Sequence, residues 1–72
     1  MGRWFMYEIS PGAYGLKGVD NVLCNFPGVL TFQRMPEMDV VEILLHCEMS
    51  PDLFPARVAI KTNQEVRLTR IT

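Results

Sequence analysis

Residues 39–49 read DVVEILLHCEM, and the conformation of this stretch decides the fold of the 72-residue chain. In a strand, successive side chains point to opposite faces, whereas in a helix they return to one face every three to four residues. As a strand the stretch has one unbroken apolar face, made of Val41, Ile43, Leu45, Cys47 and Met49. As a helix its apolar residues align less well. We therefore predict a central strand of a sheet, with a helix as the alternative.

Three shorter patterns precede this strand. Residues 3–9 alternate and are rich in aromatics, which predicts a first strand. In residues 14–26 the apolar side chains recur at i, i+3, i+4 and i+7, which is typical of an amphipathic helix. Residues 29–34 alternate again, and residues 35–38 connect this second strand to the third. A Pro-Gly pair ends both the first strand and the helix, because proline removes a ladder donor and glycine permits a turn.

Two further elements follow residue 49. Ser50 and Pro51 predict the start of a second helix, since serine caps helices and proline suits the first helical position. The residues of this helix that we expect to face the sheet are Leu53, Phe54, Ala56 and Ile60. Residues 65–72 alternate and predict a last strand. The alternative is that residues 57–61 form a strand, in a hairpin with the last one.

The predicted order is strand, helix, strand, strand, helix, strand. This order predicts an α+β fold of the ferredoxin-like βαββαβ type, in which residues 1–72 form a single domain. The four-stranded antiparallel sheet would carry both helices on one face, and the first and third strands would lie in the middle.

The composition excludes several classes of protein. Half of the residues are hydrophobic, 21% are charged, and the net charge is −1. Such a chain is too apolar to be disordered, and its seven basic against eight acidic residues do not suit a nucleic-acid surface. It has no apolar run of membrane-spanning length and no leader of the secretory kind. We expect a cytoplasmic protein that binds neither nucleic acid nor membrane.

Few residues suggest chemistry. Cys24 and Cys47 lack the spacing of a metal or redox site, so we expect both to be reduced and buried. One histidine, His46, cannot hold zinc alone. Together with Glu8 and Glu42 it suggests acid–base chemistry, but no nucleophile or cofactor loop accompanies them. We therefore predict no catalytic residues, no metal and no cofactor, and keep an enzyme with His46 as base as a distant alternative.

The sheet face without helices is the main indication of function. It would carry the apolar side chains of Trp4, Met6, Val40 and Leu44, together with His46. This is too apolar for a contiguous solvent-exposed patch, and a chain of this length is only marginally stable alone. We predict that this open face is the interface of a homodimer or larger homo-oligomer, an α/β sandwich or barrel. The alternative is a set of scattered exposed hydrophobic side chains.

Four short segments resemble the ligand-binding domain of the Lrp/AsnC family of amino-acid-responsive regulators, which also occurs as a stand-alone module. They are FMYEISPG at 5–12, NFPGV at 25–29, MDVVEILLHCEM at 38–49 and VRLTRI at 66–71. They follow the family's order of strands and Pro-Gly breaks along nearly the whole chain.

The resemblance implies a ligand site at a subunit interface. Carried over by position, its residues are Pro27, Gly28, Val29, Met38 and Asp39. Loop amides would bind a ligand carboxylate and the aspartate would accept from its ammonium group; the alternative for Asp39 is that it caps its own turn. The expected function is a non-enzymatic, dimerising regulatory module that senses an amino-acid-like small molecule. The alternative is an accessory subunit whose open face docks on a different protein of a larger complex.

Overall fold

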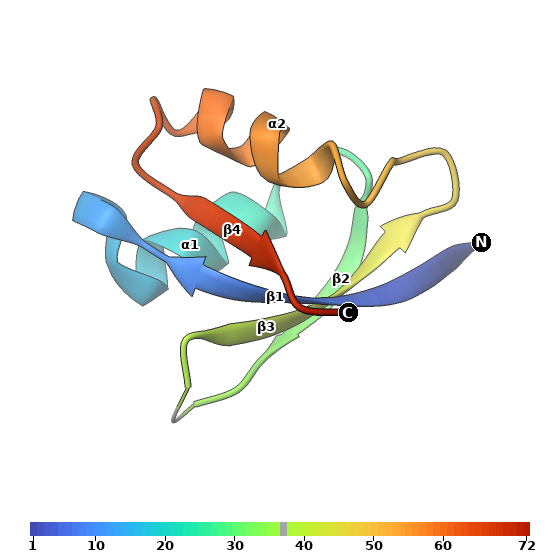
Figure 1. The fold of residues 1–72 in the computed structure, drawn as a ribbon, viewed down its shortest axis with the longest axis horizontal. Coiled ribbons are helices and arrows are strands. Elements are labelled where there is room, and N and C mark those ends of the chain that lie inside the picture. Colours follow the sequence, from blue (N-terminus) through green and yellow to red (C-terminus); the bar gives the residue numbers. More distant parts are fainter. Residues whose placement is uncertain (37) are drawn as a thin grey trace.

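The computed structural model describes residues 1–36 and 38–72 and has a mixed α+β architecture (Figure 1). In chain order its elements are β1 (Gly2–Ser10), the short 3-10 helix η1 (Gly12–Tyr14), α1 (Gly15–Cys24), β2 (Val29–Arg34), β3 (Val40–His46), α2 (Phe54–Lys61) and β4 (Arg67–Arg70). The strand predicted at residues 39–49 is confirmed over Val40–His46 as β3, so its helical alternative is excluded; residues 47–49 form a turn and do not extend the strand as predicted. Of the connection predicted at residues 35–38, Glu37 lies outside the described residues.

The four strands form one antiparallel sheet in the order β2-β3-β1-β4. β1 and β3 therefore lie in the middle, where Phe5 pairs with Ile43 and Tyr7 with Val41. Neighbouring residues along each strand alternate in burial, as the pleat requires. The arrangement is compatible with a ferredoxin-like fold.

Both helices pack on the same face of the sheet, because their buried residues belong to one core cluster with the strands. The cluster includes Phe5, Tyr7, Ile9, Ile43 and Leu45 from the central strands, Val19 and Leu23 from α1, and Phe54 and Val58 from α2. At its centre the ring of Phe54 meets that of Tyr7 at 5.6 Å and that of Phe26 edge-on at 5.3 Å between centroids. This packing buries one sheet face and leaves the other open.

The second helix begins later than the sequence predicts. Ser50 does not cap it. Instead, its hydroxyl oxygen accepts a hydrogen bond from the Leu53 N–H at 3.3 Å in a turn that precedes the helix. The α-helix itself starts at Phe54, with Pro55 in its first turn, where a missing N–H costs nothing. The hairpin alternative for residues 57–61 is excluded.

The side of α2 that faces the sheet also differs from the prediction. Its buried residues are Phe54 and Val58, one turn apart. Leu53 is 57% exposed and Ile60 70% exposed, and Ala56 is exposed as well, so three of the four residues predicted to face the sheet point away from it. The large aromatic ring of Phe54 fills the core and thereby determines which side of the helix faces the sheet.

The two cysteines also differ from the prediction, because both are exposed. Cys24 ends α1 on the side away from the buried residues Val19 and Leu23, and Cys47 follows β3 beyond the packed part of the sheet. No group of three His, Cys, Asp or Glu side chains that could hold a metal occurs among the described residues. Nor does any described helix have the length and apolarity needed to cross a bilayer.

Thr62 connects the end of α2 to β4 and provides a test of the fold. Its buried hydroxyl donates to the Val58 carbonyl at 2.9 Å and accepts from the Val66 N–H at 3.0 Å. We expect Thr62→Val to lower the free energy of unfolding by about 1–3 kcal/mol in urea titrations, because the Val66 N–H loses its partner. Hydrogen exchange at Val66 should accelerate in Thr62→Val but not in Thr62→Ser, which keeps the hydroxyl; equal exchange in both variants would contradict the assignment.

Candidate functional site

The open face of the sheet is defined by the strand register. Trp4 of β1 lies opposite Leu44 of β3, Met6 lies opposite Glu42, and Leu44 also pairs with Thr31 of β2. All five point away from the helices, since the buried residues alternate with them along the strands. Trp4 is 51% exposed and Leu44 and Met6 are half-buried. The predicted interface residues Trp4, Met6 and Leu44 are therefore neighbours at the centre of this face.

Leu30 extends this apolar surface, although strict alternation along residues 29–34 would place it on the same side of the strand as Phe32, which packs against the core. The pairing of β2 with β3 shifts between Val29 and Thr31, so Leu30 falls in an irregularity of the ladder. Its side chain, 50% exposed, lies over Gly2, where an added Cβ would come within 2.8 Å of the Leu30 Cδ1. The extra residue in the ladder reverses the direction of Leu30, and nothing in the local sequence marks this shift.

Val40 does not contribute to the exposed surface as predicted. It pairs with Glu8 at the start of β3 and is only 7% exposed within a single chain. The exposed apolar surface of the open face therefore includes Leu30 and does not include Val40.

His46 lies far from the carboxylates that the sequence associated with it. His46 pairs with Gly2, whereas Glu8 pairs with Val40, six residues further along β1. At 3.3–3.4 Å per strand residue this is roughly 20 Å. The His46 Nδ1 atom instead accepts a hydrogen bond from the Glu48 N–H at 3.1 Å. The trio needed for acid–base chemistry is not assembled.

The predicted ligand-binding residues fall into two groups at opposite ends of β3. At one end the Gly28 carbonyl accepts a hydrogen bond from the His46 N–H at 2.8 Å, with Pro27 and Val29 beside it. At the other end, the Asp39 carbonyl accepts from the Ile9 N–H at 2.6 Å, next to the exposed Met38. The seven residues of β3 separate the groups by roughly 20 Å. One chain alone does not bring the five residues together.

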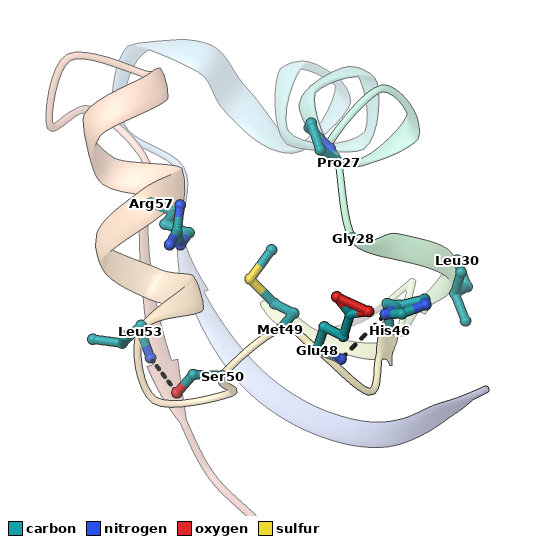
Figure 2. A pocket seen from close by; sticks show the side chains of 9 residues that line it. All are labelled: Pro27, Gly28, Leu30, His46, Glu48, Met49, Ser50, Leu53 and Arg57. Carbon is teal, nitrogen blue, oxygen red and sulfur yellow. Dashed lines mark hydrogen bonds between the residues drawn. The ribbon is translucent and has the colours of Figure 1, made fainter.

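A cavity of about 480 Å³ opens beside the first group (Figure 2). Pro27 and Gly28 line one side and Arg57 of α2 the other, with the Met49 side chain between them. Glu48, His46 and Ser50 supply further polar groups at its lower end. Glycine is favoured at position 28 because its φ is +92°, a backbone conformation that other residues rarely adopt; the Met49 side chain lies directly against it. The predicted Pro27–Gly28 pair thus lies at a cavity, which Val29, Met38 and Asp39 do not line.

Two more cavities continue this one between the helices. The next, of about 310 Å³, shares Pro27, Met49 and Arg57 with the first and adds Ile60 and Lys61. A third, of about 360 Å³, shares Lys61 and runs to Tyr14 and Gly18 at the start of α1. Because neighbouring cavities share lining residues, together they form one groove along α2, which we call the helix groove. The sequence reasoning missed Arg57, Ile60 and Lys61; two basic residues one turn apart in a helix without acidic residues were the available signal.

Comparison of the chain with models of known protein families, with curated proteins and with solved structures finds no match.

Proposed function

We propose that the protein is a non-enzymatic regulatory module that forms a homodimer, open face on open face, and binds a small amino-acid-like molecule at the subunit interface. The observation that carries the dimer is the exposed apolar centre of this face, where Trp4 and Leu44 form a cross-strand pair and Leu30 lies nearby. Half of the Trp4 side chain is in water in the single chain, although tryptophan is among the side chains that gain most from burial at an interface.

The size of the molecule indicates how much of the face a dimer must use. The single chain has an accessible surface of 4640 Å². A stable specific interface buries about 800 Å² per partner. A homodimer would therefore bury roughly a sixth of this surface, and we expect its interface to include the polar residues Glu42 and Gln33 beside the apolar centre. A charged side chain introduced at the apolar centre of the open face would be buried in this interface.

The ligand part of the proposal is supported by the resemblance to the Lrp/AsnC domains and by the separation of the five predicted residues. A two-fold axis that pairs the sheets with their strands antiparallel would bring the Gly28 end of one protomer toward Asp39 of the partner subunit. The two halves of the site would then meet only in the dimer. Such a site would couple ligand binding to dimerisation, which is what a sensor requires.

The oligomeric state tests the dimer. Light scattering of the purified protein should give twice the chain mass of 8.2 kDa. We expect Leu44→Glu to give a folded monomer, because the carboxylate would be buried without a partner in the interface. Ile60→Glu, the same kind of change on the exposed side of α2, should leave the dimer intact. A wild-type monomer would contradict the dimer and favour the alternative, an accessory subunit that docks on a different protein.

The ligand is tested separately. Thermal unfolding of the wild-type protein should shift upward in the presence of at least one of the common amino acids, since a ligand that binds only the folded state stabilises it. Asp39→Asn should abolish the shift if this carboxylate accepts from the ligand ammonium group. If the protein is a dimer but its thermal unfolding responds to no amino acid, the proposed interface stands and the proposed ligand is contradicted.

A further inference from the structure

The helix groove runs along α2 between the two helices, and only the Leu30 and His46 end of its first cavity reaches the open face that the proposed dimer would use. We propose that it docks an acidic, amphipathic helical segment of a partner protein. The proposal rests on Leu53, Arg57, Ile60 and Lys61 and requires neither the dimer nor the amino-acid ligand; the first cavity of the groove shares Pro27 and Gly28 with the proposed ligand site.

The groove has an apolar surface that is exposed to water in the single chain. Ile60 is 70% exposed and Leu53 57% exposed, and at positions seven residues apart they lie on one side of α2. Pro27 and Met49 form the floor between α2 and the end of α1. Neither Ile60 nor Leu53 belongs to the core, so they do not stabilise the fold by burial. Their position instead resembles the exposed half of a helix–helix contact.

Positive charge predominates along the groove. Arg57 and Lys61 lie four residues apart on α2, about 6 Å along its axis, and the helix contains no acidic residue. Among the described residues the ion pairs join Arg34 to Asp20 and Arg70 to Asp52, so neither groove cation is engaged in one. Glu48, at the far end of the first cavity, is the only acidic side chain that lines any of the three described cavities. A partner with carboxylates one turn apart would match this pair.

The form of the groove favours a segment of protein over a small ligand. Three linked cavities extend from Tyr14 to Leu30, and each is open to solvent along its length. A small molecule is held when most of its surface is buried, whereas an amphipathic helix lies along an open groove with its apolar face down. The partner helix would place aliphatic side chains on Ile60 and Leu53 and its acidic residues beside Arg57 and Lys61.

A pair of defined peptides tests the proposal with the full chain. The probe is a fluorescent peptide of about 16 residues, or four helical turns, with a leucine face and glutamates beside it. Its counterpart has lysine in place of each glutamate. In anisotropy titrations we expect the glutamate peptide to bind at least tenfold more tightly than the lysine peptide, with affinity falling as salt is raised. Amide NMR shifts on binding should map to Met49 and α2.

Variants of the groove residues distinguish binding in the helix groove from nonspecific binding of the peptide elsewhere on the protein. Arg57→Glu with Lys61→Glu should reverse the preference between the two peptides, and Ile60→Ser should weaken the glutamate peptide several-fold. Lys17→Glu, the same charge change on an exposed site of α1 outside the cavities, should have little effect. Equal binding of both peptides, an unchanged preference in the double variant, or shifts confined to the open face around Trp4 would each overturn the proposal. So would binding of laurate in the groove without binding of the peptide.

Discussion

Phe54→Ala is expected to be the most destabilising single substitution in this protein, with a loss of about 3–5 kcal/mol in the free energy of unfolding. Phe54 is fully buried, contacts the rings of Tyr7 and Phe26, and joins α2 to the sheet. A domain of this size has only about 4–11 kcal/mol of stability in total. Urea unfolding followed by circular dichroism should therefore show a midpoint far below that of the wild type.

The neighbouring Leu53→Ala is the matched control. Leu53 is one residue away on the same turn but 57% exposed, so its truncation should cost well under about 1 kcal/mol. The sequence pattern predicted both residues to face the sheet. Similar losses in the two variants would show that α2 is rotated relative to the arrangement described above.

Alkaline unfolding is expected to depend on Tyr7. Its phenol donates a hydrogen bond to the Pro51 carbonyl at 2.7 Å in the core, and burial raises the pKa of Tyr7 to about 12. Nearby Arg70 opposes this shift, and Asp52 adds to it. A raised pKa means that the folded state holds its proton more tightly than the unfolded state does. The stabilisation is therefore complete below about pH 10, the ordinary pKa of tyrosine, and is lost as the pH rises towards 12.

Because the pKa of Tyr7 is about 12 in the folded protein against about 10 ordinarily, raising the pH from 10 to 12 should cost roughly 2–3 kcal/mol of stability. Tyr7→Phe should lower stability at neutral pH by about 1 kcal/mol, through the lost hydrogen bond, and should remove most of the alkaline decline. Tyr14→Phe, at an exposed tyrosine, should keep that decline. Urea titrations between pH 10 and pH 12 would measure the free energy of unfolding of each variant. If it falls as steeply with pH in Tyr7→Phe as in the wild type, the alkaline decline is due to groups other than Tyr7.

Arg57 and Lys61 of the helix groove, and Leu30 on the open face, were found only in three dimensions. The two cations can be seen in the sequence, but their alignment along a groove depends on which side of α2 faces the sheet. The sequence pattern predicted a different side of this helix to be buried. Leu30 depends on an irregularity of the ladder between Val29 and Thr31. Both cases involve residues whose direction is determined by packing with distant segments. A local pattern cannot contain that information.

The amino-acid sequence by itself determined the elements and one face of the sheet. Alternation in residues 3–9 and 39–49 is a local property of the chain, and a strand that buries Phe5, Tyr7 and Ile9 must turn Trp4 and Met6 the other way. Tertiary structure alone decided which side of α2 faces the core, how far His46 lies from Glu8, and that Cys24 and Cys47 are exposed. Those outcomes depend on register and on competition among side chains for one small core, and both are settled only when all the elements pack together.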